Sequence, residues 1–249
     1  MAENPTLRVC ALYGELMNIY ADRGNLLLLE RRCRWRGIGF ELANATLGDR
    51  LDADAHDLYY IGGGQDADQR LCAADLVEHK APALHAAAAR GALVLGVCGG
   101  YQLLGHGYQL EDAWLPGAGL VDLETVRVEG PRLIGNVAIE VDLDDGPKRV
   151  LAGFENHAGR TRLGADEHPL GRVLRGHGND GRSAAEGVRR GGVIGTYLHG
   201  PLLPKNAWFA DWLIAAALDT GVAELGPLDD ALEDAAHAAA RRAAGIAER

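Results

Sequence analysis

A cysteine set between glycines is the residue of this sequence best placed to do covalent chemistry. Cys98 lies in Gly96-Val97-Cys98-Gly99-Gly100, directly after an apolar run rich in Val and Leu and directly before a helix-like pattern. This order is that of a nucleophile elbow, with sulfur in place of the serine oxygen. The glycines permit a sharp turn, and the N-terminus of the following helix stabilises a thiolate and lowers its pKa. We therefore predict that Cys98 is a nucleophile, although the turn alone equally allows a buried structural cysteine.

A histidine at the end of a second β-rich run would supply the general base. The run over residues 192–198 ends in His199-Gly200-Pro201, and Gly-Pro stops a strand, which leaves the imidazole at the strand's carboxyl end. Sheets of α/β proteins hold their active sites at that edge. A lone histidine is more often a surface or capping residue, but beside an elbow cysteine it is the expected base.

Strands that alternate with helices predict an α/β fold, with a mostly parallel central sheet covered by helices on both faces. The expected strands are 7–13, 39–43, 58–61 and 92–97, and the expected helices are 24–36 and 71–90, the second interrupted at Pro82. Asp22 and Asn25 precede the first helix and are interpreted as capping and turn residues.

The second half of the chain changes to short β runs. They cover residues 120–128, 136–141 and 150–154, with turns such as Asp144-Asp145-Gly146-Pro147 between them, and predict extra antiparallel strands. Residues 176–182 have the composition of a surface loop, and 229–249 that of a helix packed on the domain, acidic early and basic late. We expect a single domain over 1–249, with a catalytic core of about residues 7–218.

Composition restricts the class of protein. The chain has 249 residues, of which 47% are hydrophobic, so it is long and apolar enough for a sizeable core. A net charge of -10 argues against nucleic acid or an anionic membrane as the main partner. The first residues lack the pattern of a signal peptide, and no apolar run reaches membrane-spanning length, so we expect a cytoplasmic protein. The four cysteines show neither C-x-x-C nor zinc-ligand spacing, which fits a reducing compartment and no structural metal.

Several segments together resemble a known family. The pattern G-x-C-x-G-x-Q over 96–102, a Gly62-Gly63-Gly64 loop after a strand, and a late strand-end histidine are similar to the class I (triad) glutamine amidotransferases. More narrowly the chain resembles their CobB/CobQ-like branch, and within it the GatD-type glutaminase subunits of lipid II isoglutaminyl synthase. The segments that carry this narrower resemblance are Tyr20-Ala21-Asp22-Arg23-Gly24-Asn25, Ile61-Gly62-Gly63-Gly64, Cys98-Gly99-Gly100-Tyr101-Gln102, Gly153-Phe154-Glu155-Asn156-His157 and Gly195-Thr196-Tyr197-Leu198-His199-Gly200-Pro201-Leu202-Leu203-Pro204-Lys205-Asn206. They keep the family order from about residue 7 to about residue 218.

The resemblance implies hydrolysis of glutamine. Cys98 would attack the side-chain amide, His199 would transfer protons, and the N–H groups of Gly63 and Gly99 would stabilise the oxyanion. Two further residues would bind glutamine, Gln102 on the helix after the elbow and Arg132, whose guanidinium suits an α-carboxylate. A helical Gln and a surface Arg are otherwise commonly just solvated. His157 lies near the pocket of related proteins and is interpreted as architectural.

One departure from the family pattern concerns the third member of the triad. Triad amidotransferases carry His-x-Glu, in which the acid orients the histidine, whereas this chain reads His199-Gly200-Pro201. Either a distant carboxylate of this chain or a partner subunit would supply the acid, and the resemblance favours the partner. The isolated subunit is then expected to be a weak glutaminase.

The resemblance also implies which partner receives the ammonia. The glycine loop lacks the Gly-Lys-Ser/Thr ending of a Walker A motif, so we expect no cofactor in this chain, and ATP and Mg on the partner. In the family a Mur-ligase-like (MurT-type) subunit uses ATP to amidate the α-carboxylate of D-glutamate in lipid II, a lipid-linked acceptor of peptidoglycan synthesis.

Two other functions stay open. The amidotransferase module of cobyric or cobyrinic acid synthesis is related, but it usually follows a fused ATP-binding domain, whereas the glutaminase pattern here begins at residue 7. A catalytically weak scaffold subunit that only binds glutamine is the other, and the presence of both Cys98 and His199 argues against it.

Overall fold

The computed structural model describes residues 4–18, 22–111, 113–143 and 146–247. Four residues of the quoted motifs and turns, Tyr20, Ala21, Asp144 and Asp145, lie outside the described residues, as do the first three and the last two residues of the chain.

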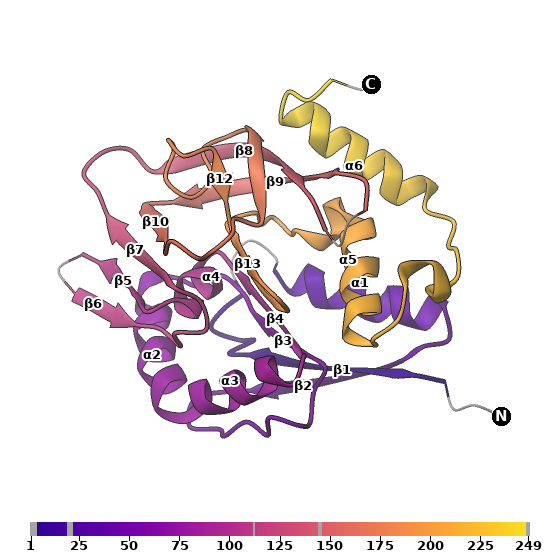
Figure 1. Ribbon diagram of the computed structural model, residues 1–249, viewed down its shortest axis with the longest axis horizontal. Helices are drawn as coiled ribbons and strands as arrows, with labels where there is room; N and C mark the ends of the chain where they lie inside the picture. The colour runs from indigo at the N-terminus through magenta and orange to yellow at the C-terminus, as the bar shows by residue number, and fades with distance from the viewer. Residues whose placement is uncertain (1–3, 19–21, 112, 144–145, 248–249) are drawn as a thin grey trace.

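A six-stranded sheet forms the centre of the molecule (Figure 1). Its strand order is β13-β14-β4-β3-β1-β2, and every neighbouring pair is parallel except the edge pair β13 and β14. The strands are β1 (Thr6–Leu12), β2 (Gly39–Ala45), β3 (Leu58–Ile61), β4 (Leu93–Val97), β13 (Val188–Arg190) and β14 (Val193–Thr196). The four strands expected in the first half of the chain are therefore confirmed, with bounds that differ by at most two residues.

Helices cover both faces of this sheet, as the alternating pattern predicts. Alternate side chains of β1 point to opposite faces. Leu7, Val9 and Ala11 join the core cluster beneath α1 (Arg23–Trp35) and α5 (Ala207–Ala217). Cys10 and Leu12 join the cluster beneath the helices that follow β3.

The helical segment after β3 differs from the prediction at both its start and its interruption. It begins at Asp66, five residues earlier than predicted, and consists of α2 (Asp66–Asp75), a π-helical stretch η2 (Leu76–Lys80) and α3 (Ala81–Ala89). Pro82 lies in the first turn of α3, directly after the π-helical stretch, and its missing N–H removes one backbone donor at this junction. The irregularity is therefore the π-helical stretch before the proline.

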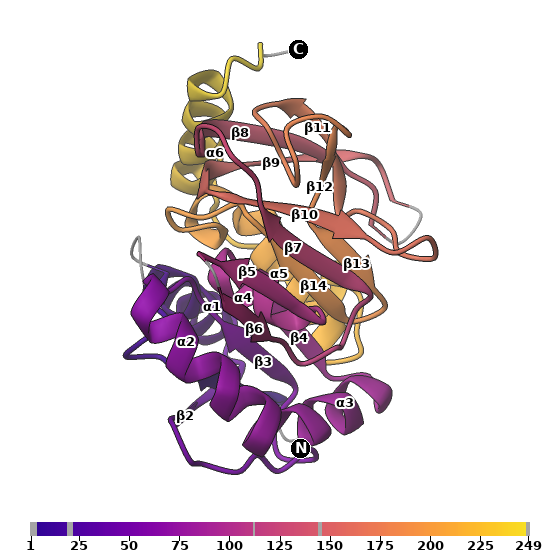
Figure 2. The same cartoon turned by 90° about the vertical axis from the view of Figure 1, so that its left-hand side faces the viewer.

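Two smaller sheets carry the antiparallel strands predicted for the second half. One has the order β12-β11-β8-β9 and lies above the central sheet, beside α6 (Ala231–Ala243) (Figure 2). The other has the order β10-β7-β5-β6, in which only β5 and β7 are parallel. Their strands are β5 (Gly107–Leu110), β6 (Ala113–Pro116), β7 (Leu123–Arg127), β8 (Leu133–Val141), β9 (Arg149–His157), β10 (Gly159–Leu163), β11 (Gly171–Arg175) and β12 (Ala185–Glu186).

The remaining elements are helices that follow β4 and β14. A six-residue helix, α4 (Gly99–Leu104), follows β4, and two short 3-10 helices, η3 (Leu203–Lys205) and η4 (Val222–Leu225), flank α5. The helix predicted at the C-terminus is α6, none of whose residues is buried. No helix in the described part of the chain is long and apolar enough to cross a membrane.

Candidate active site

Cys98 stands on a strained turn between β4 and α4. Its φ is 54° and its ψ is -107°, a combination that costs an L-residue about 1–3 kcal/mol and is found mostly at functional sites. The strain lies on the cysteine itself, because none of its neighbouring glycines has a positive φ. These glycines instead allow close approach: a Cβ on Gly100 would collide with the carbonyl oxygen of Ile61. The predicted elbow is thus present, but its glycines are needed because a side chain there would collide with neighbouring atoms, not because they adopt a positive φ.

The elbow opens into a cavity of about 440 Å³. Three predicted site residues meet there, Cys98, Gln102 and Arg132, with His157 beside them. The full lining is Gly64, Gln65, Ala67, Gln69, Cys98, Gln102, Tyr108, Gln109, Leu110, Arg127, Arg132, Asn156, His157, Ala158 and Gly159. Gly63, Gly99 and His199 are not part of that lining in the described chain.

His199 follows the strand next to that of Cys98 and does not line the cavity within the described residues. Strand β14 runs parallel to β4, and the N–H of Cys98 donates to the carbonyl of Thr196 at 2.8 Å, so Cys98 and His199 follow neighbouring strand ends. The imidazole has no exposed surface and stands edge-on to the Phe154 ring, with 5.8 Å between ring centres. Burial, then the nearby Lys205 and His157, lower the pKa of His199 to about 4. A neutral imidazole is the form that accepts a proton from a thiol.

The side chain of Arg132 lines the cavity and is held in place by two hydrogen bonds to Asn156. Its Nε donates to the Asn156 side-chain oxygen at 2.9 Å, and its Nη2 donates to the Asn156 carbonyl at 3.0 Å. These two bonds orient the guanidinium and, within the described residues, use two of its five N–H groups. Gln102 donates from Nε2 to the hydroxyl of Tyr197 at 3.3 Å and is almost fully buried. Both side chains therefore line the cavity into which Cys98 opens.

The pKa of Cys98 contradicts the prediction that the helix N-terminus lowers it. Burial and the carboxylate of Asp22 raise the pKa of the thiol to about 12, and the opposing effects of the Gly99 N–H and of Arg132 are smaller. The helix after the elbow has only six residues, and its dipole is correspondingly weak. Cys98 is therefore a neutral thiol in this state, and it must lose its proton as it attacks.

The interpretation of Asp22 and Asn25 as capping and turn residues is confirmed only for the position of Asp22. Asp22 is the N-cap residue of α1, but its side chain makes no capping bond, and Asn25 lies inside the helix. Asp22 is completely buried, and its Oδ2 accepts the N–H of Gly63 at 2.8 Å. Asn25 is also buried and links the hydroxyl of Tyr60 to the N–H of Leu203. Both side chains bind the active-site loops rather than the helix end.

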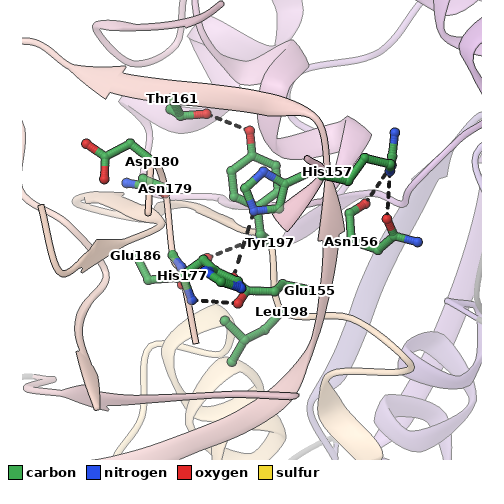
Figure 3. A network of polar contacts seen from close by, with 12 residues as sticks. Glu155, Asn156, His157, Thr161, His177, Asn179, Asp180, Glu186, Tyr197 and Leu198 are labelled. Atoms are coloured by element: carbon green, nitrogen blue, oxygen red, sulfur yellow. Dashed lines mark hydrogen bonds and ion pairs between the residues drawn. The ribbon is translucent and has the colours of Figure 1, made fainter. Parts of the chain in front are cut away.

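A buried polar network supports the wall of the cavity opposite Cys98. Figure 3 shows the imidazole of His157 lying flat against the Tyr197 ring, with 3.6 Å between ring centres. Nδ1 of His157 bonds the Gly159 carbonyl at 2.9 Å, and Nε2 lies 3.8 Å from a carboxylate oxygen of Glu155. Since both ring nitrogens face protein groups other than Cys98, the arrangement favours an architectural role for His157.

The loop over 176–182 is less exposed to solvent than its composition predicts. Its residues Gly178 and Asn179 are buried, although the rest of the loop is mostly exposed. Glu155 accepts the backbone N–H groups of His177 and Gly178, at 2.6 and 2.9 Å (Figure 3). The loop is thereby tied to the end of β9, next to the cavity.

Comparison with known proteins identifies the family. Residues 8–207 match the CobB/CobQ-like glutamine amidotransferase domain. The chain belongs to the CobB/CobQ-like glutamine amidotransferases. Among the solved structures, PurLQS from Thermotoga maritima superposes with a TM-score of 0.55 at 22% identity, over 86% of this chain and 95% of that chain. The similarity in fold agrees with the predicted α/β architecture.

The curated proteins similar to this amidotransferase include GatD subunits and cobyric acid synthases. The GatD subunit of the glutamine-hydrolysing lipid II isoglutaminyl synthase of Streptococcus pneumoniae is 37% identical over 214 residues, which cover 85% of this chain and 80% of that protein. The GatD subunit of Staphylococcus aureus is 36% identical, covering 86% of this chain and 85% of that protein. Cobyric acid synthase of Methylorubrum populi is 39% identical over 130 residues, only 50% of this chain and 25% of that protein.

The residues missed by the sequence analysis share one property. Asp22, Asn156 and Tyr197 all stand within the segments that carry the family resemblance, yet their roles are contacts with residues distant in the chain. The signal that marks them is therefore membership of those segments, because no local pattern places Asp22 against Gly63 or Asn156 against Arg132.

Proposed function

We propose that this amidotransferase is the glutaminase subunit of a lipid II isoglutaminyl synthase. It hydrolyses glutamine to glutamate and ammonia, and a Mur-ligase-like (MurT-type) partner uses ATP and the ammonia to amidate the α-carboxylate of D-glutamate in lipid II. The observation that carries the glutaminase part is the strained Cys98 facing a cavity that also holds Arg132. The identity of the acceptor is supported by the two GatD relatives, which are similar over most of both chains.

The reaction begins with glutamine held at both ends. Arg132 pairs with its α-carboxylate, and Gln102 contacts the bound amino acid. The thiol proton of Cys98 passes to the buried neutral His199 as sulfur attacks the amide carbon. The resulting oxyanion accepts hydrogen bonds from the N–H groups of Gly99 and Gly63, the second after it leaves Asp22.

Three proton transfers complete the turnover. The imidazolium of His199 protonates the leaving nitrogen, the C–N bond breaks, and ammonia departs from a γ-glutamyl thioester. His199 then takes a proton from water, whose oxygen attacks the thioester carbon. The C–S bond breaks, the proton returns to sulfur, and glutamate leaves. The balance is glutamine plus water to glutamate plus ammonia.

The same proposal includes what the partner subunit binds and the compartment in which the reaction takes place. ATP and Mg bind to the partner of a heterodimer, the ammonia passes between the subunits, and both work in the cytoplasm. All four cysteines are free thiols, which fits a reducing compartment.

A cobyric acid synthase-type amidotransferase is the second candidate. One observation favours it, the 39% identity to cobyric acid synthase, which is slightly higher than the identity to either GatD protein. That similarity covers only half of this chain and a quarter of the other protein, so it supports the shared glutaminase chemistry rather than the acceptor.

The experiment that tests the proposal reconstitutes the reaction. The purified chain is incubated with glutamine, alone and with its Mur-ligase-like partner, ATP, Mg and lipid II, and glutamate is quantified together with the mass of the lipid-linked product. We expect glutamate formation and a product one mass unit lighter than lipid II, both absent with Cys98→Ala. Glutamate formation without amidated lipid II would support the glutaminase activity and contradict lipid II as the acceptor.

A further inference from the structure

A buried carboxylate occupies a backbone N–H group that the glutaminase site would need for its oxyanion. Asp22 has no exposed surface, and one of its oxygens, Oδ2, accepts the N–H of Gly63 at 2.8 Å. Gly63 is one of the two predicted oxyanion donors. Within the described residues the other oxygen, Oδ1, is buried without a hydrogen-bond partner. Buried carboxylates are ordinarily fully bonded, so a half-satisfied one at an active site points to a functional role.

The groups around Asp22 do not neutralise its charge. Tyr60, from β3, directs its hydroxyl to the backbone carbonyl of Asp22 at 3.4 Å, and Cys98 lies close enough for its pKa to be raised by the carboxylate. Arg132 is a cation that acts on Cys98, and Tyr60 and Tyr197 are titratable groups near the thiol. No ion pair to Asp22 occurs within residues 4–18, 22–111, 113–143 and 146–247. Burial consequently raises the pKa of Asp22 to about 7, against the smaller opposing effect of the Gly63 N–H.

An ionised Asp22 opposes two steps of the reaction. A negative charge near sulfur disfavours the thiolate, and a like charge near the substrate oxygen disfavours the tetrahedral oxyanion. The N–H of Gly63 is also committed to a carboxylate, which is a stronger acceptor than the neutral amide oxygen of bound glutamine. Removing one oxyanion donor lowers kcat by about 10²–10³-fold in enzymes of this kind of chemistry.

We propose that Asp22 restrains the site: its carboxylate holds the Gly63 N–H and opposes ionisation of Cys98, so that turnover requires Asp22 to be neutral or withdrawn. This proposal rests on the proposed function for its effect on glutamine hydrolysis. Its effect on the thiol is independent of the substrate, and the two effects are measured separately.

The test compares two replacements of Asp22 with a matched control. Asp22→Asn keeps the shape and an acceptor for Gly63 but removes the charge, and Asp22→Ala removes both. Glu15→Gln removes one exposed carboxylate from the same connection between β1 and α1 and serves as the control. Alkylation of Cys98 by iodoacetamide is followed from pH 6 to 10 by mass spectrometry, and glutamine hydrolysis by the single chain is measured alongside.

The proposal expects faster alkylation without the charge. Loss of a neighbouring like charge lowers a thiol pKa by about one unit, so alkylation in Asp22→Asn accelerates about tenfold between the pKa of Asp22, about 7, and that of the thiol, and the difference shrinks at pH 6, where Asp22 is protonated. The kcat for glutamine rises in both Asp22 variants with a smaller change in KM, and Glu15→Gln behaves as wild type. Alkylation that is unchanged or slower in Asp22→Asn overturns the restraint. Glutamine hydrolysis is also measured with the Mur-ligase-like partner, and faster alkylation with no hydrolysis in any variant under either condition instead overturns the proposed function.

A measurement on the unaltered chain guards against variants that fail to fold. The amide proton of Gly63 is observed by NMR as pH is changed. Since it donates to the Asp22 carboxylate, its chemical shift should move with a midpoint near 7 as the acid titrates. A shift that is constant from pH 5 to 9 overturns the proposed contact.

Discussion

Of the four cysteines, Cys98 alone is partly exposed, while Cys10, Cys33 and Cys72 are buried in the hydrophobic core. Burial raises the pKa of all four thiols, to about 11 or 12. A low thiol pKa therefore does not distinguish the nucleophile. Its opening into a cavity and the histidine that follows the neighbouring strand do distinguish it, because such a base allows the thiol proton to leave during the attack.

A glutamine-directed electrophile should accordingly modify one position. We expect 6-diazo-5-oxo-norleucine to add once per chain, at Cys98, and peptide mapping by mass spectrometry checks the position. Cys98→Ala should take up no label and hydrolyse no glutamine. Adducts spread over Cys10, Cys33 and Cys72 would contradict the assignment, and so would glutaminase activity in Cys98→Ala.

Arg132 is expected to contribute to binding rather than to the chemical steps. Replacing it by Ala removes a charge-assisted contact of ~2 kcal/mol, so KM for glutamine should rise about thirtyfold with little change in kcat. Arg132→Lys should recover part of the loss, since a lysine keeps the charge without the planar fork. Steady-state kinetics measure both. Arg172→Ala, which removes an exposed arginine paired with Glu140 at 3.1 Å, is the control, and a normal KM in Arg132→Ala would refute the role.

At the scale of elements, the elbow and the glycine loop form one unit. The N–H of Gly100 donates to the carbonyl of Gly62 at 3.0 Å, and Gln69 donates to the carbonyl of Gly64 at 2.8 Å. The elbow follows β4, the glycine loop follows β3, and these strands are paired in parallel. The geometry of the candidate oxyanion site thus depends on backbone contacts between two loops, not on either loop alone.

Sequence patterns predict such elements unequally well. The buried strands β3 and β4 are continuous apolar runs bounded by glycine or polar residues, so their existence and their bounds were predictable. The hairpin β5–β6 was missed, since its strands have four residues each and its burial alternates weakly. The side-chain contact of Asp22 was not predicted, because an acid before a helix fits a capping pattern locally, while its hydrogen-bond partner Gly63 is 41 residues away. Tertiary contacts of this kind leave no periodic trace in a sequence.

The helices α1 and α5 are joined by a buried ion network. Arg32 has no exposed surface and donates from Nη2 to Asp211 of α5 at 2.6 Å and from Nη1 to Asp230, just before α6, at 2.8 Å. Its hydrogen bond to Asp230 holds the pKa of that carboxyl below its usual range. One guanidinium therefore connects three helical segments that are far apart in the sequence.

Removal of this guanidinium should destabilise the chain strongly. Arg32→Ala leaves the buried Asp211 with only Arg36, and breaking a buried pair typically costs about 3–5 kcal/mol. Urea unfolding at pH 7 measures the loss. Asp230 contributes stability above the ordinary Asp pKa and loses it as pH falls, so the gap to wild type should narrow below about pH 4. Arg34→Ala, on the exposed side of the same helix, should change stability by less than about 1 kcal/mol. Equal losses in both variants would contradict this account.

On the scale of the whole molecule, the central sheet brings the three loops of the site to one edge. The glycine loop, Cys98 and His199 follow β3, β4 and β14, which are adjacent in the sheet. The two smaller sheets enclose this edge, and His157 and Asn156 at the end of β9 complete the cavity. His199 is consequently enclosed, and its position is set by the pairing of its backbone with Phe154.

The last prediction concerns the acid that orients His199. The chain has Gly200 and Pro201 where the family pattern carries the acid, and the pKa of His199 is lowered to about 4 by burial, Lys205 and His157. A carboxylate brought to the imidazole by the Mur-ligase-like partner would raise this pKa and fix the tautomer that accepts the thiol proton. Loss of the orienting acid costs a triad on the order of 10⁴-fold in kcat. Complex formation should therefore raise kcat for glutamine by orders of magnitude while KM changes only a few-fold, and the acidic limb of the kcat profile should move to higher pH.

Glutamine hydrolysis is measured for the single chain, for the complex, and for complexes in which each carboxylate of the partner's interface is replaced by its amide, with carboxylates outside the interface replaced as controls. One interface replacement should return kcat to the value of the single chain. Full activity of the single chain would refute the shared triad, as would activity that survives every replacement, and the orienting acid would then have to belong to this chain.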